Sequence, residues 1–192
     1  MPIFRIKPEM QIGANLPSTK SKRLSSGING NFETIEIMQR VARERSRHPL
    51  VRDLALKILL YYKVPSQHYR DEALAIGDWV KKKVRYVRDI KDVETLHDPL
   101  TIIDQIKRGV AQGDCDDMAL LIASLLLSIG HAPYFKAIKY KKGFPSLQHI
   151  YVVVFERNQG ETAKTQIALD AIMKTKPIGY EVPSVESYLF KA

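Results

Sequence analysis

Cysteine is almost absent from this 192-residue chain, which contains only Cys115. A single cysteine excludes an intramolecular disulfide and cannot build a cysteine-rich zinc site. The chain also lacks a phosphate-binding loop, a glycine-rich dinucleotide turn and zinc-finger spacing. We therefore expect no cofactor and no metal.

No segment has the pattern of a membrane span or a secretory signal. The N-terminus lacks a continuous apolar core, so we expect no signal peptide. Residues 118–135 carry no charge, but Gly130 and Pro133 would end a helix within this run. The run therefore predicts a buried core helix.

The basic charge of the chain is unevenly distributed. The net charge is +9, and residues 1–60 contain 11 Lys or Arg against 5 Asp or Glu, whereas residues 61–192 contain 19 against 16. A basic arm can bind nucleic acid or an acidic protein surface. A solvated tail and helix face explains the excess equally well.

The predicted elements run from helices to strands. Residues 1–32 are rich in Pro, Gly and Ser and predict an extended basic arm. Residues 33–130 carry helical periodicity, with Pro49 and Asp98-Pro99 at helix starts. Residues 131–192 contain the strand patterns "YFKAIKY", "HIYVVVFE" and "TQIALDAI", and "RNQGETAK" predicts a turn. The last segment, "VESYLF", fits a helix or a strand. This order predicts one α+β domain over residues 33–192.

Cys115 stands among three carboxylates in "GDCDDMALLIASLLLSIG". It is an inert core cysteine, a metal ligand or a nucleophile. At a helix start, the backbone N–H groups favour its thiolate, whereas Asp114, Asp116 and Asp117 oppose it. Asp114 and Asp116 can instead cap the helix. The cluster lacks calcium-loop spacing, so a metal bound there, with His131 or His149, is the weaker alternative.

Two further residues can join Cys115. His149 opens the strongest predicted strand, and Asp170 lies near the end of the next. A tight connection makes these strands antiparallel neighbours, which brings His149 beside Asp170. Packing the Cys115 helix on this sheet would complete a nucleophile, a base and an orienting acid. Each residue alone is more often structural.

The motifs "DWVKKKVRYVRD", "GDCDDMALL", "QHIYVVVFE" and "ALDAI" resemble those of the transglutaminase-like superfamily of papain-like thiol enzymes. The resemblance covers about half the chain, from Ala75 to Ile172. It implies a papain-like core in which Cys115 is the nucleophile, His149 the base and Asp170 the orienting group. Residues 34–59 before this core resemble a subgroup common in tailed-bacteriophage structural gene regions.

The sequence departs from the family pattern at two positions. Tyr151 stands two residues after the histidine, where tryptophan is usual, and Ala171 follows Asp170 where Pro or Ser is frequent. In a thiol enzyme, the backbone N–H groups at the start of the Cys115 helix can stabilise the oxyanion of the intermediate. The sequence does not identify a second hydrogen-bond donor to that oxyanion. Gln112, Trp79 and Tyr86 are its candidates, and they are also candidates for lining a substrate groove.

Two functions follow as expectations. The first is a thiol hydrolase or acyltransferase that acts on peptide or glutamine amides, with a role in phage particle assembly or entry. The second is a non-catalytic virion protein that keeps the fold and binds DNA or neighbouring phage proteins through residues 1–60. A phage origin would place the protein in the virion or the host cytoplasm, and any other origin in the cytoplasm.

Overall fold

The computed structural model describes residues 25–88, 95–156 and 165–192. Five helices occupy the first part of the described chain: α1 (Gly27–Arg45), α2 (Pro49–Tyr62), α3 (Tyr69–Lys83), α4 (Pro99–Arg108) and α5 (Cys115–Ser128). A four-stranded antiparallel sheet follows, in the order β5 (Thr165–Leu169), β4 (His149–Glu156), β3 (Tyr134–Lys139) and β6 (Glu186–Lys191). This confirms the α+β layout, with "VESYLF" contributing a strand.

Local sequence signals explain several helix starts. Pro49 occupies the first turn of α2, and the His48 side chain accepts a hydrogen bond from the Leu50 N–H at 3.2 Å. Asp98 caps α4 in the same way, because its carboxylate accepts from the Leu100 N–H at 2.9 Å. Both prolines stand where a missing N–H costs the helix nothing.

Helix α1 begins earlier than the sequence predicts. It starts at Gly27, so residues 27–32 of the expected arm are helical, whereas residues 1–24 of that arm lie outside the described residues. Gly27 and Gly30 are poor helix formers, which is why this stretch predicts a loop. The early start carries Asn31 to the loop before β4, where its side chain accepts from the Leu147 N–H at 2.8 Å.

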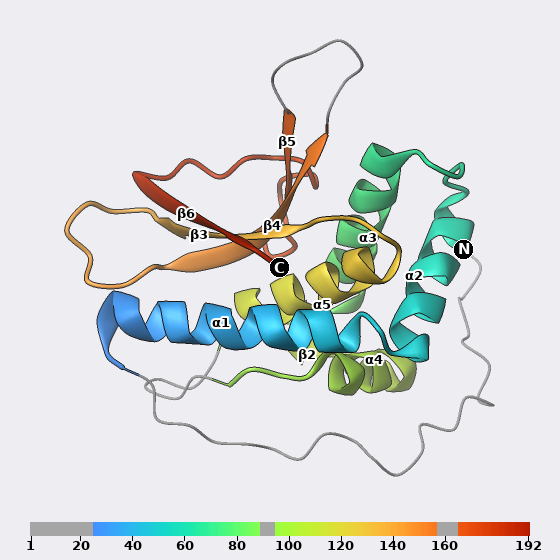
Figure 1. Cartoon of the computed structure of the whole chain (residues 1–192), viewed down its shortest axis with the longest axis horizontal. Coiled ribbons are helices and arrows are strands. Elements are labelled where there is room, and N and C mark those ends of the chain that lie inside the picture. Colours follow the sequence, from blue (N-terminus) through green and yellow to red (C-terminus); the bar gives the residue numbers. More distant parts are fainter. Residues whose placement is uncertain (1–24, 89–94, 157–164) are drawn as a thin grey trace.

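Helix α5 lies at the centre of the molecule, between the other helices and the sheet (Figure 1). Its apolar residues are almost all buried, which confirms the predicted core helix. No helix in the described ranges is long and apolar enough to cross a membrane. The central helix therefore fixes the position of Cys115 at its first residue.

The sheet packs its two faces against different partners. Alternate residues of β3 and β4, among them Phe135, Ala137 and Val152, join the main core with α5. The opposite face carries Ile138, Tyr151 and Val153 in a second, smaller cluster. His149 shares this second face with Tyr151, because side chains two residues apart on a strand point the same way.

A two-stranded parallel pair lies beside the N-terminus of α5. Strand β1 (Arg85–Tyr86) pairs with β2 (Gln112–Gly113), with Tyr86 opposite Gly113. Two-residue strands are too short to leave a period in the sequence, and this pair was not predicted. It brings Tyr86 to the end of α5 that bears Cys115.

Candidate active site

Cys115 is the first residue of α5 and is partly buried. Asp114 is the N-cap, and it forms a reciprocal capping box with Asp117. The Asp117 N–H donates to Asp114 Oδ1 at 3.5 Å, and the Asp114 N–H donates to Asp117 Oδ2 at 3.3 Å. The cap holds the helix start in one conformation, and the N–H groups of this first turn lack acceptors within the helix.

Gly113 is required by a close approach. A Cβ placed there would lie 2.8 Å from both Cβ and Oδ2 of Asp117. Real side chains do not tolerate this separation, so only glycine allows Asp117 to fold back over the start of α5. The glycine of the Gly-Asp-Cys motif thus has a packing reason.

The three aspartates do not all act on the thiol in the same way. Asp117 is fully buried and accepts from the His97 N–H at 2.7 Å, while its other oxygen lies 2.8 Å from His97 Nδ1. Burial raises the pKa of Asp117, and the contacts with His97 oppose that shift. Asp114 and Asp116, in contrast, line a cavity together with Cys115. Only these two place their charge at the same cavity wall as the thiol.

His149 and Asp170 form a buried pair. His149 Nε2 lies 2.7 Å from Asp170 Oδ2, and the Ile172 N–H donates to Asp170 Oδ1 at 3.1 Å. His149 opens β4, and Asp170 directly follows β5, whose Leu169 pairs with Val152. The antiparallel register therefore brings the two side chains together, as expected from the sequence. Since Nε2 meets the carboxylate, Nδ1 is the ring nitrogen that can meet the thiol.

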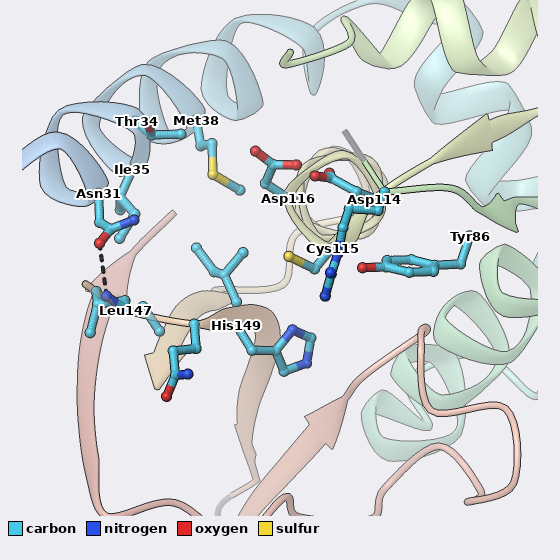
Figure 2. A pocket seen from close by; sticks show the side chains of 14 residues that line it. Asn31, Thr34, Ile35, Met38, Tyr86, Asp114, Cys115, Asp116, Leu147 and His149 are labelled. Carbon is cyan, nitrogen blue, oxygen red and sulfur yellow. Dashed lines mark hydrogen bonds between the residues drawn. The ribbon is translucent and has the colours of Figure 1, made fainter. Parts of the chain in front are cut away.

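Cys115 and His149 line one cavity of about 250 Å³. Cys115 reaches the cavity from the N-terminus of α5, and His149 reaches it from the start of β4. The Tyr86 hydroxyl points toward Cys115 (Figure 2). Asp170 stands behind His149, away from the cavity lining. The structure thus brings the predicted nucleophile and base to one space and places the predicted orienting acid against the base.

The three candidates for the second oxyanion donor have different positions. Tyr86 lines the cavity. Trp79 is 2% exposed in the core on α3, and Gln112 is exposed, with its side-chain oxygen accepting from Arg85 Nη2 at 2.9 Å. Neither of the last two belongs to the cavity lining. Of the three candidates, Tyr86 is thus the one that lines the cavity, while Trp79 packs in the core on α3 and the Gln112 side chain bonds to Arg85.

The cavity is also lined by residues of α1 and by Arg88, which the sequence did not indicate as site residues. Asn31, Thr34, Ile35 and Met38 form one wall, and Arg88 adds a positive charge to the lining. Asn31 lay in the predicted arm, and Arg88 lay in the motif "DWVKKKVRYVRD", where no residue except Trp79 and Tyr86 was a site candidate. The apolar spacing of Ile35 and Met38 predicted a buried face but not a cavity.

The acidic cluster is the one place in the described residues where three potential metal ligands gather. Oxygens of Asp114, Asp116 and Asp117 lie within 4.8 Å of one another. Asp117 Oδ1 and Oδ2 already accept hydrogen bonds from His97 and Asp114, and Asp116 Oδ1 accepts from the Asp117 N–H at 2.9 Å. A cation bound through Asp117 would compete with the His97 contacts and with the capping bond from the Asp114 N–H. The two histidines considered as further ligands pair with other carboxylates. His131 Nε2 lies 2.7 Å from Glu72 Oε2, and His149 Nε2 lies 2.7 Å from Asp170 Oδ2.

The chain has weak likenesses to known proteins. No protein-family model matches it, and no curated protein matches it. Among solved structures, it is similar to a candidate cysteine protease from Cytophaga hutchinsonii. That pair has a TM-score of 0.44 and 18% identity over 74% of this chain and 50% of the other, so the chain spans half the length of that protein. It is also similar to Legionella pneumophila LapG, with a TM-score of 0.44 and 15% identity over 82% of this chain and 87% of that one.

Proposed function

We propose that the protein is a transglutaminase-like cysteine hydrolase or acyltransferase that acts on peptide or glutamine amides through Cys115, His149 and Asp170. One observation carries the proposal: the only thiol of the chain shares a cavity with an imidazole whose far nitrogen is held 2.7 Å from a buried carboxylate. The carboxylate holds one ring nitrogen of His149 and leaves the other to accept the thiol proton, as general-base catalysis requires.

The first half of the reaction forms a thioester. The thiol proton passes to His149 Nδ1, and the Cys115 sulfur attacks the amide carbonyl carbon. The carbonyl π electrons move to oxygen, and the resulting oxyanion lies at the N-terminus of α5, where backbone N–H groups favour negative charge. The C–N bond then breaks as the imidazolium gives its proton to the departing amine. Asp170 stabilises the imidazolium while His149 carries the proton, and does not itself take that proton.

The second half releases the acyl group. His149 takes a proton from water or from an amine, and the resulting oxygen or nitrogen nucleophile forms a new bond to the carbonyl carbon. The tetrahedral oxyanion then re-forms the carbonyl, the C–S bond breaks, and the proton on His149 returns to the Cys115 sulfur. Water yields a carboxylic acid, whereas a lysine amine yields a new amide. We propose hydrolysis as the main fate, because a solvent-connected cavity admits water.

The charges around the thiol support an ion pair with His149. Asp114 and Asp116 oppose the thiolate, and Arg88 together with the start of α5 favours it. The imidazolium is the positive group held in place by the structure, since Asp170 fixes its opposite nitrogen. The positive partner of the Cys115 thiolate is therefore a side chain that the structure holds in place.

Alkylation of Cys115 tests this function, because the chain has a single cysteine and any label reports on it alone. The rate of iodoacetamide labelling is measured from pH 5 to 10 in the wild type and in His149→Ala. His131→Ala is the matched control, since His131 also pairs with a carboxylate, at 2.7 Å from Glu72, but outside the cavity.

We expect fast labelling near neutral pH in the wild type and in His131→Ala, and slow labelling in His149→Ala. An ordinary thiol profile centred near pH 8.5 in all three proteins would reject the enzyme assignment. Hydrolysis or transfer would then be followed by mass spectrometry of a glutamine-containing peptide with and without a lysine-containing peptide.

The more specific expectations stay predictions. A role in a phage particle, a place in the virion or host cytoplasm, and DNA binding through residues 1–60 rest on the sequence resemblance and on the basic arm. Binding to DNA would weaken with salt and on deletion of residues 1–24, and a deletion without effect would remove the arm from this role.

A further inference from the structure

The imidazole of His149 lies between two tyrosine rings. Tyr151 stacks on it with ring centroids 5.4 Å apart and planes inclined by 29°, and Tyr140 stacks on it at 6.0 Å and 14°. These separations lie within the range of favourable aromatic contacts. Tyr140 belongs to none of the motifs that point to a thiol enzyme.

The strand register places the two tyrosines on opposite sides of the histidine. In the antiparallel pair β3–β4, Ile138 is opposite His149 and Lys136 is opposite Tyr151. Tyr140 follows Ile138 by two residues, so it lies beyond His149 in the direction away from Tyr151. The ring of His149 is therefore enclosed along the strand direction from both sides.

Hydrogen bonds hold the side chain of Tyr151 and the backbone of Tyr140. The Tyr151 hydroxyl donates to Glu181 Oε1 at 2.6 Å. The same oxygen accepts a hydrogen bond from Lys136 Nζ at 2.6 Å. The N–H groups of Tyr140 and Lys141 donate to Gln148 Oε1 at 3.0 and 3.2 Å. Gln148 directly precedes His149, so the backbone of Tyr140 is tied to the same strand as the imidazole.

The two tyrosines differ in their access to solvent. Tyr151 is 2% exposed and belongs to the core beneath the sheet, whereas Tyr140 is 39% exposed. Tyr140 therefore covers the solvent side of a histidine that is itself buried. Removing its ring would open the imidazole to water without removing a core residue.

We propose that Tyr140 is a positioning residue for His149: its ring, opposite Tyr151, holds the imidazole plane and stabilises the imidazolium that pairs with the Cys115 thiolate. This inference rests on the proposed function and deepens it. An aromatic face carries negative charge density and attracts a cation within about 6 Å of its centroid. Asp170 holds only Nε2 of His149. The two tyrosine rings therefore restrict rotation of the imidazole about that contact.

The ring of Tyr140, and not its ionisation, carries this role. Burial raises the pKa of Tyr140 to about 12, and the negative charges of Asp170 and Cys115 add to the shift. The phenol is therefore neutral at any pH at which the thiol would act. Around His149 the other charged or titratable groups are Asp170, Tyr151 and the cavity residues Asp114, Asp116, Tyr86, Arg88 and Cys115.

The test compares Tyr140→Leu, which keeps an apolar bulk without a π face, with Tyr140→Phe, which keeps the ring. Tyr69→Leu is the matched control, because Tyr69 contacts a different histidine, His131, edge-on at 5.5 Å. The first readout is the pH profile of iodoacetamide labelling of Cys115. We expect Tyr140→Leu to slow labelling near neutral pH about fivefold, and Tyr140→Phe and Tyr69→Leu to match the wild type.

The second readout does not use the thiol. In a Cys115→Ala background, the ring protons of His149, assigned with His149→Ala, are followed by NMR, since stacked rings shift them upfield. We expect this upfield shift to shrink in Tyr140→Leu and persist in Tyr140→Phe. This readout also shows whether each variant is folded around His149.

The outcomes separate the positioning role from the proposed function. One outcome is that the wild type labels like an ordinary thiol while the upfield shift of the His149 ring protons still depends on Tyr140. In that case the proposed function and the positioning role both fail, and Tyr140 only contacts His149. If the wild-type profile depends on His149 but Tyr140→Leu matches the wild type, only the positioning role is overturned. Equal losses in Tyr140→Phe and Tyr140→Leu would overturn it as well, because the hydroxyl would then be the active part.

Discussion

His149 Nε2 and Asp170 Oδ2 lie 2.7 Å apart although 21 residues separate them in the chain. Both side chains are buried, and the Ile172 N–H holds the second carboxylate oxygen. A buried carboxylate without a partner would be costly, so the pair is mutually required. This relationship defines the ring nitrogen that faces the cavity, and the first prediction follows from it.

Replacing the carboxylate should weaken the thiolate. Asp170→Asn presents a neutral amide that stabilises the imidazolium less than a carboxylate does, and its N–H group can favour the wrong tautomer of His149. Cys115 would then revert toward an ordinary thiol, of which only a few per cent is ionised at pH 7. We expect the iodoacetamide labelling rate at pH 7 to fall about thirtyfold. Glu72→Gln, which alters the His131 pair outside the cavity, should leave the rate unchanged; an equal fall there would indicate a general structural effect.

Tyr86 should assist only reactions that form an oxyanion. Its hydroxyl points toward Cys115 in the cavity, whereas Gln112 is exposed and bonded to Arg85. Tyr86→Phe should slow acylation by p-nitrophenyl acetate about 100-fold, as loss of one oxyanion donor does. It should leave iodoacetamide alkylation unchanged, since alkylation passes through no tetrahedral oxyanion. If Gln112→Ala slows acylation and Tyr86→Phe does not, the donor assignment is wrong.

Gly113→Ala should displace Asp117 and loosen the start of α5. The added Cβ would meet Asp117 Cβ and Oδ2 at 2.8 Å. Overpacking of this kind costs about 1–3 kcal/mol in the free energy of unfolding. Urea unfolding measures this loss, and labelling should slow because the cap positions Cys115. Gly109→Ala is the comparison, because Gly109 has no atom within 4 Å of an added Cβ; it should lose stability through its positive φ of 77° but keep the labelling profile.

Tyr140 should couple stability to alkaline pH. Its pKa rises from 10.0 to about 12, first because of burial and then because of Asp170. The folded protein therefore holds the phenol proton more tightly than the unfolded chain does. The stability contributed by this group is fully present below pH 10 and is lost as pH rises through about 12. The urea midpoint should fall less across this window in Tyr140→Phe than in the wild type; parallel curves would contradict this environment for Tyr140.

The sequence predicted the features that depend on local signals. Pro49 and Asp98 mark helix starts by their own chemistry, and the apolar residues 118–126 define a buried helix. The proximity of His149 and Asp170 was also predictable, since a short connection between two strands requires an antiparallel pair. These signals lie within one element or between two consecutive elements.

The features that the sequence missed depend on contacts between distant elements. The stack of Tyr140 on His149 depends on the register of β3 against β4, which the seven-residue segment "KKGFPSL" between Tyr140 and Gln148 does not define. The wall from α1 depends on a helix that begins in a glycine-containing segment. Trp79 was a candidate for the groove because aromatic residues suit both a groove and a core, and the packing of α3 places it in the core.

The most direct test of the central claim is the absorbance of the thiolate near 240 nm, titrated in the wild type and His149→Ala with Cys115→Ala subtracted. If Cys115 and His149 form an ion pair, the absorbance of one thiolate is already present at about pH 6 in the wild type and appears only near pH 8.5 in His149→Ala. A single transition near pH 8.5 in both proteins would show that His149 does not activate Cys115 and would contradict the account.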